Sequence, residues 1–114
     1  MFSFTDRNIL VTGAGSGIGK ATALALGQQG GSLIVVDRNQ ETADRTVEQL
    51  EQIGAKAKAI WADISDLEAV DRMYAEILEN FETLDGIVHC AGIGIERTIM
   101  ETTIEEWNRI ISVN

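Results

Sequence analysis

A glycine-rich turn near the N-terminus holds the residues whose type and spacing best suit ligand chemistry. Residues 8–20 read NILVTGAGSGIGK, an apolar run followed by glycines at positions 13, 17 and 19. Because glycine lacks a Cβ, the backbone can bend sharply there and approach a ligand closely. A helix that begins near Ile18 would direct unpaired N–H groups and about half a positive charge at the turn. The pattern predicts a phosphate or pyrophosphate site; the alternative is a strand–helix turn that needs glycine only for its geometry.

An acidic residue, Asp37, closes the next apolar run at residues 32–37. In a nucleotide-binding βαβ unit, a carboxylate at this place accepts hydrogen bonds from the adenosine ribose; a solvated strand-end carboxylate is the alternative. The same charge repels a 2′-phosphate, whereas the neighbouring Arg38 could pair with one. Ser16 adds no charge to the glycine turn. We therefore expect NAD as the cofactor, with NADP as the alternative.

Two further polar residues are candidates for a site. Asp63 follows the third apolar run, where it could accept a hydrogen bond from an adenine amine or cap the turn before Ser65. Asn114 falls on the same face of the last predicted helix as Trp107. Because a buried amide needs partners, Asn114 is either a structural hydrogen-bonding residue or part of a polar site.

The single histidine and the single cysteine, His89 and Cys90, stand in an apolar run. We expect a buried imidazole at His89, with a catalytic imidazole as the alternative, and a small core residue at Cys90. For Trp61, packing in the core or an interface is the default expectation. No His, Cys, Asp or Glu cluster has the spacing of metal ligands, so no metal site is expected.

Strand and helix patterns alternate along the chain. Strands are predicted at residues 9–12, 32–37, 58–62 and 85–90, and helices follow each of them. Asn39, Ser65 and Thr103 are the expected N-caps of the last three helices. With right-handed crossovers, this alternation predicts an α/β fold with a doubly wound parallel sheet in the strand order 3-2-1-4. The candidate residues then gather at the carboxyl ends of the strands.

Each predicted helix carries an apolar stripe that we expect to face the core. The expected inner residues are Ile18, Ala21, Thr22, Ala25 and Leu26; then Ala43, Val47, Leu50 and Ile53; then Leu67, Val70, Met73, Tyr74, Ile77, Leu78 and Phe81; and finally Ile104, Trp107, Ile110 and Ile111. The last stripe carries more apolar surface than a truncated helix can bury, and it predicts self-association into a homo-oligomer.

Composition and charge restrict the function classes. The chain has 114 residues, 45% of them hydrophobic, which fits one domain over residues 1–114. A net charge of −9 argues against nucleic acid and anionic membranes as partners. No apolar run is long enough to span a bilayer, the first residues lack signal-peptide features, and one cysteine allows no internal disulfide. A cytoplasmic protein is the expectation.

The chain resembles the short-chain dehydrogenase/reductase family. Residues 12–19, TGAGSGIG, match that family's T-G-x-x-x-G-I-G turn, and residues 63–65 (DIS), 91–92 (AG) and 112–114 (SVN) follow in the family's order. The resemblance runs from about Arg7 to the last residue. It implies a Rossmann-type fold that holds NAD(H) or NADP(H) for hydride transfer between alcohols and ketones.

The resemblance also assigns roles to individual positions. Asn114 matches the family's catalytic asparagine, which helps to hold a water molecule in a proton relay. Asp37 would bind the adenosine ribose, with Arg38 beside it. The other implied cofactor-binding residues are Gly13, Ser16, Gly17, Ile18 and Gly19 at the pyrophosphate, Asp63 and Ile64 at the adenine, and Ala91 and Gly92 at a ribose.

The chain departs from the family pattern in two places. His89 and Cys90 stand where the family usually has two asparagines, and the family's Tyr-x-x-x-Lys has no match, since the single tyrosine, Tyr74, is followed by Ala-Glu-Ile-Leu. We therefore expect the cofactor-binding half of a longer enzyme, truncated before the later strands and inactive alone.

Two other functions remain open: a dinucleotide-binding module without catalysis, and, more remotely, an S-adenosylmethionine-dependent methyltransferase, because residues 13–17 also contain G-x-G-x-G. The substrate, a small carbonyl or alcohol compound, cannot be specified. A 3-oxoacyl carrier-protein reductase and a polyol dehydrogenase would look alike over these residues.

Overall fold

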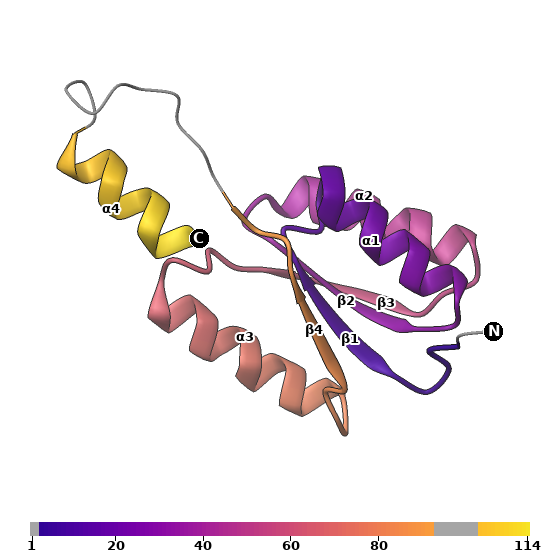
Figure 1. Cartoon of the computed structure of the whole chain (residues 1–114). Coiled ribbons are helices and arrows are strands. Elements are labelled where there is room, and N and C mark those ends of the chain that lie inside the picture. Colours follow the sequence, from indigo (N-terminus) through magenta and orange to yellow (C-terminus); the bar gives the residue numbers. More distant parts are fainter. Residues whose placement is uncertain (1–2, 93–102) are drawn as a thin grey trace.

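The computed structural model describes residues 3–92 and 103–114. At its centre lies a four-stranded parallel sheet in the order β3-β2-β1-β4 (Figure 1). The predicted α/β class and strand order are confirmed. The elements are β1 (Asn8–Thr12), α1 (Gly17–Gln28), β2 (Ser32–Asp37), α2 (Gln40–Gln52), β3 (Ala57–Trp61), α3 (Leu67–Asn80), β4 (Gly86–His89) and α4 (Ile104–Val113).

The two inner strands are buried on both faces. On one face, Ile9, Val11, Leu33 and Val35 pack beneath α1 and α2; on the other, Leu10, Ile34, Val36 and Ile60 pack against α3. Figure 1 shows the same layers, with α1 and α2 covering one side of the sheet and α3 the other. Burial on both faces explains why β2 is an almost unbroken apolar run rather than an alternating one.

Helix α1 turns a different face to the core from the one predicted. Its buried residues are Gly19, Ala23 and Gly27, whereas Ile18 is 80% exposed. A Cβ on Gly27 would lie 2.5 Å from Leu50 Cδ2, so the helix packs closely because its inner face is small. The predicted stripe is wrong because apolar periodicity does not count glycine as an inner residue: Leu26 does pack against the core, but Ile18, Ala21 and Ala25 are exposed.

The remaining helices follow their predicted stripes in part. The buried residues are Ala43, Thr46 and Leu50 in α2 and Ala69, Met73 and Ile77 in α3. Predicted inner residues Ile53, Leu67 and Leu78 are exposed instead, since each stands at or beyond the edge of its stripe. Against the described residues, α4 buries none of its side chains; Ile104, Trp107 and Ile111 are exposed.

Two of the three predicted N-caps are confirmed. Asn39 accepts a hydrogen bond from the Thr42 N–H at 3.2 Å, and Thr103 accepts one from the Glu106 N–H at 3.1 Å. The third prediction is wrong by one residue, because Asp66 rather than Ser65 caps α3. Ser65 is engaged elsewhere, by Asp63.

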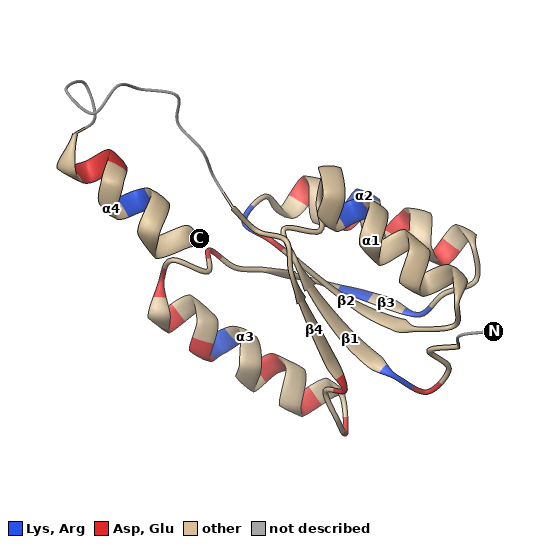
Figure 2. Ribbon diagram, in the orientation of Figure 1, with Lys and Arg blue, Asp and Glu red and all other residues tan. Residues whose placement is uncertain are grey.

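Charged residues lie mainly on the helices. Figure 2 shows acidic residues on α2, α3 and α4 with fewer basic ones among them, in keeping with the net charge of −9. Within residues 3–92 and 103–114, no helix has the length and apolar character that crossing a membrane requires.

Candidate cofactor site

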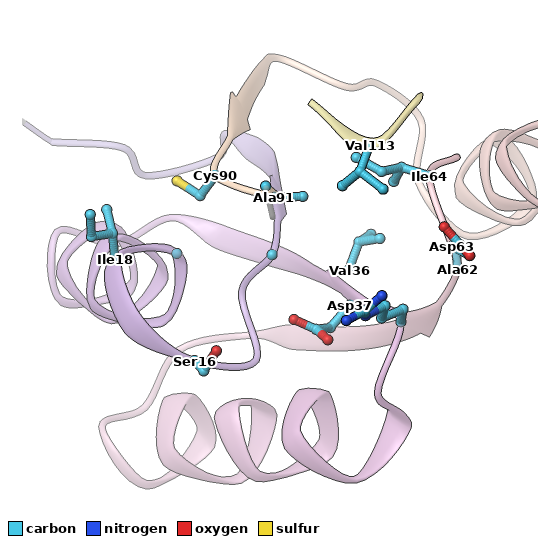
Figure 3. A pocket seen from close by; sticks show the side chains of 14 residues that line it. Ser16, Ile18, Val36, Asp37, Ala62, Asp63, Ile64, Cys90, Ala91 and Val113 are labelled. Carbon is cyan, nitrogen blue, oxygen red and sulfur yellow. The ribbon is translucent and has the colours of Figure 1, made fainter. Parts of the chain in front are cut away.

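A pocket of about 330 Å³ lies at the carboxyl ends of the strands. Figure 3 shows Ser16 and Ile18 on one side of it, Val113 and Ile64 on the other, and Asp37 between them. The lining residues are Gly13, Ser16, Ile18, Gly19, Val36, Asp37, Arg38, Ala62, Asp63, Ile64, Cys90, Ala91, Gly92 and Val113. Of the cofactor-binding positions expected from the sequence, Gly17 alone is not among them. The topology thus brings together residues that lie far apart in the chain.

The glycine-rich turn is held against the ends of two strands. Gly13 has φ +65°, and a Cβ there would lie 2.7 Å from the Ala91 N and Cα atoms. The Ala14 N–H donates to the Val36 carbonyl at 3.1 Å. Position 13 therefore requires glycine both for its backbone angle and for its close contact with the end of β4.

The beginning of α1 is suited to an anion. Ser16, its N-cap, makes no side-chain capping bond within the described residues, and the first turn, Gly17–Ile18–Gly19, carries no carboxylate. Gly17 has φ +56°, and no described atom lies within 4 Å of where its Cβ would be. Unpaired N–H groups and the positive end of the helix dipole thus meet open space beside the pocket, which is what a diphosphate requires.

Two threonines that the sequence analysis did not single out fix this turn. The Thr46 hydroxyl, fully buried on α2, donates to the Ala14 carbonyl at 2.9 Å. Thr12 Oγ1 accepts hydrogen bonds from the Cys90 and Ala91 N–H groups at 3.2 and 3.4 Å. Thr46 lies three residues after Ala43 and four before Leu50, on the apolar face of α2. A hydroxyl on that face is the one sequence signal that could have identified it.

The Asp37 carboxylate is oriented by two backbone donors. Its Oδ2 accepts from the Gly15 N–H and its Oδ1 from the Asn39 N–H, each at 3.0 Å. A carboxylate oxygen can accept more than one hydrogen bond, so both oxygens retain capacity toward the pocket. This arrangement could accept the two hydroxyls of a ribose.

Asp63 makes the turn-capping contacts and also lines the pocket. Its Oδ1 accepts from the Ser65 hydroxyl at 2.6 Å and the Ser65 N–H at 3.0 Å. These two bonds hold the pKa of the Asp63 carboxyl below its usual range; the charges of Arg109 and Arg38 act in the same direction, and partial burial opposes them. Capping of the turn at Ser65 and acceptance of a hydrogen bond from an adenine amine, the two roles considered for Asp63, are therefore compatible with each other.

The end of α4 reaches the end of β4. Asn114 Oδ1 lies 3.3 Å from where a Cβ on Gly92 would be, and Val113 lines the pocket. Cys90 packs partly against the core and also lines the pocket. The expected burial of His89 is wrong: it is exposed together with Ile87, because no described element covers that face of β4, whereas Val88 and Cys90 pack against the core on the other face.

Metal ligands do not assemble in the described part of the chain. No group of three or more His, Cys, Asp or Glu side chains there could hold a metal ion. The polar groups around the pocket are backbone N–H groups, the Ser16 hydroxyl, two carboxylates and one guanidinium, which suit a nucleotide.

The comparisons with known proteins assign the chain to a family. The model of the short chain dehydrogenase family matches residues 7–114, so the chain belongs to that family. It is 36% identical over 115 residues to a 3beta-hydroxysteroid dehydrogenase of Mediterraneibacter gnavus, covering 100% of this chain and 42% of that protein. It is 40% identical over 112 residues to a cyclohexanol dehydrogenase of Acinetobacter sp., covering 97% and 45%.

Solved structures share the same fold. A hydroxysteroid dehydrogenase from Escherichia coli superimposes with a TM-score of 0.93 at 26% identity, covering 98% of this chain and 47% of that one. A short-chain type dehydrogenase/reductase from Mycobacterium ulcerans gives 0.89 at 36%, covering 99% and 42%. The chain therefore spans less than half the length of these relatives. The family assignment replaces the methyltransferase alternative.

Proposed function

We propose that this chain is the dinucleotide-binding part of an NAD(P)-dependent oxidoreductase that interconverts a secondary alcohol and a ketone. The observation that carries the proposal is the convergence of the glycine turn, Asp37, Asp63 and Ala91–Gly92 on one pocket. Family membership supports the reaction class. Cyclohexanol and a 3beta-hydroxysteroid, named in two relatives, are both secondary alcohols.

The chain's own residues would bind and orient the dinucleotide. The amides at the start of α1 would hold the diphosphate, and Asp37 would accept the hydroxyls of the adenosine ribose. Asp63 and Ile64 would flank the adenine, with Val113 beside Ile64. When bound, the nicotinamide ring supplies the hydride acceptor or donor.

The second ribose would lie against Ala91 and Gly92, which line the pocket at the end of β4. Asn114 would hold a water molecule in the proton relay, because its amide lies against Gly92 at the same end of the pocket.

NAD rather than NADP is the proposed cofactor. A 2′-phosphate on the adenosine ribose would lie beside the Asp37 carboxylate, which two N–H donors hold in place, and the two neighbouring anions would repel each other. Arg38 lines the same pocket, and its positive charge would reduce the preference for NAD over NADP without removing it.

Calorimetric titration of the chain with NAD and NADP tests this proposal. We expect saturable binding of NAD, weaker binding of NADP, and a reversed preference in Asp37→Asn. Asp44→Asn, which removes an exposed carboxylate on α2, is the matched control and should leave both affinities unchanged. Neither heat nor thermal stabilisation at millimolar NAD would refute the dinucleotide site.

Binding without turnover is the proposal for the 114 residues alone. The family's Tyr-x-x-x-Lys does not occur in this sequence, and a general acid must stand within hydrogen-bond reach of the carbonyl that it protonates. NADH formation from cyclohexanol, followed by absorbance, is expected to be undetectable. Turnover by this chain would contradict the assignment and would require another proton donor.

Self-association is proposed through α4, where Ile104, Trp107 and Ile111 are exposed on the described surface. Sedimentation velocity should show a dimer or larger species that dissociates in Trp107→Glu. A monomer at high protein concentration would contradict this proposal without affecting the cofactor site.

A further inference from the structure

Trp61, the last residue of β3, contacts the turn that carries Asp37. Its indole N–H donates to the carbonyl oxygen of Arg38, between β2 and α2. The parallel register places Asp37 beside Trp61, and the Ala62 N–H donates to the Asp37 carbonyl at 3.1 Å. The tryptophan is 57% exposed, so burial in the core does not account for its place.

The bond to Arg38 reaches the Asp37 carboxylate through one rigid unit. The Arg38 carbonyl and the Asn39 N–H are the two ends of a single planar peptide group. At the far end of that group, the Asn39 N–H donates to Asp37 Oδ1 at 3.0 Å. A donor on the carbonyl end fixes the plane of the peptide group and polarises its N–H, which strengthens the second bond.

The second carboxylate oxygen is held from another direction. Asp37 Oδ2 accepts from the Gly15 N–H in the glycine-rich turn at 3.0 Å. A Cβ on Gly15 would lie 2.8 Å from that oxygen and 2.4 Å from Thr42 Oγ1, so the carboxylate is closely confined on this side. The peptide group between Arg38 and Asn39 supports the other oxygen: Asn39 is anchored as the N-cap of α2, and the Trp61 side chain holds the carbonyl end of the group.

We propose that Trp61 is a positioning residue for recognition of the adenosine ribose, acting through the peptide group between Arg38 and Asn39 on the Asp37 carboxylate. This role rests on the proposed dinucleotide site and deepens it. Trp61 also contributes to the preference for NAD, because a carboxylate fixed in this orientation opposes a 2′-phosphate more strongly than one that can turn away.

The first test is Trp61→Phe, which keeps an aromatic ring and removes the N–H donor. Loss of one hydrogen bond is expected to raise the dissociation constant for NAD about fivefold. Affinity for NADP should change less, so the ratio of the two constants moves toward NADP. Tyr74→Phe removes the hydroxyl group of an aromatic residue on α3, away from the contacts of Trp61 and Asp37, and should leave both dissociation constants unchanged.

A double-mutant cycle separates positioning from general stability. In an Asp37→Ala background, Trp61→Phe should have no further effect on NAD affinity, because the carboxylate through which it acts is gone. Equal effects in both backgrounds, or no effect in either, would overturn the positioning role. If the unaltered chain binds no dinucleotide, the proposed function itself fails, and this role fails with it.

Amide proton NMR gives an independent readout that needs no ligand. Trp61→Phe should shift the Asn39 amide resonance and lower its protection from exchange, whereas the Glu68 amide, bound to Asp66 at 3.0 Å, should be unaffected. An unchanged Asn39 amide would overturn the proposed path from Trp61 to Asp37.

Discussion

Gly17 and Gly54 provide a matched pair of glycines. Both have positive φ, +56° and +83°, and at both the space that a Cβ would enter is open among the described residues. Gly17 begins α1 beside the pocket, whereas Gly54 follows α2 at the opposite end of the neighbouring helix. An alanine at either position therefore suffers the same kind of backbone strain without a steric clash.

The expected cost to folding is similar at the two positions. A left-handed conformation costs an alanine about 1 kcal/mol relative to glycine. For a domain of this size, that corresponds to a decrease of roughly 4 °C in the melting temperature. Gly17→Ala and Gly54→Ala should thus show nearly equal unfolding transitions in urea or on heating.

Their effects on NAD affinity should differ sharply. Residue 17 stands between Ser16 and Ile18, which line the pocket, so a methyl group in the open space there is expected to hinder the close approach of a diphosphate to the amides at the start of α1. Loss of one hydrogen bond to a charged group raises the dissociation constant about tenfold or more. Calorimetry on the two variants measures this directly. Equal affinities in Gly17→Ala and Gly54→Ala would refute the placement of the diphosphate at this turn.

Two further outcomes follow from the contacts around the turn. Thr46→Val, which removes a buried hydroxyl from the Ala14 carbonyl, should lower the free energy of unfolding in urea by about 1–2 kcal/mol; Thr46→Ser should restore most of it, and an unchanged value would show that the bond adds nothing. Because the pKa of Asp63 is lowered in the folded state, its stabilisation is present above the unfolded pKa and is lost as the pH falls through the folded value. Ser65→Ala should therefore destabilise the chain at neutral pH and differ less from the parent in acid denaturation; a pH-independent difference would contradict this cause.

The sheet and the gathering of the candidate residues at one pocket could be predicted from the sequence because local patterns encode them. Apolar runs such as residues 32–37 mark strands buried on both faces, and the glycine turn fixes where α1 begins. Parallel topology then gathers the strand ends, so Asp37 and Asp63 fall at one pocket without any further information.

The errors have a common physical origin in tertiary packing. The inner face of α1 could not be recognised by its apolar stripe, because close contact there favours Gly19, Ala23 and Gly27 over larger residues. The bonds from Thr46 to Ala14 and from Trp61 to Arg38 join residues 32 and 23 positions apart, and no local periodicity reports such pairs. His89 is exposed because no described element covers its face of β4, and its neighbours in sequence do not report this.

The small residues on the inner face of α1 support the helix at a distance from the pocket. Gly27 lies eight residues, or about 12 Å, along the helix axis from Gly19. A methyl group added there would lie 2.5 Å from Leu50 Cδ2 and 3.2 Å from the Ala55 Cβ, so Leu50 would have to move for α1 to keep its place. The packing that holds α1 in place thus depends on a small residue at the end of the helix remote from the pocket.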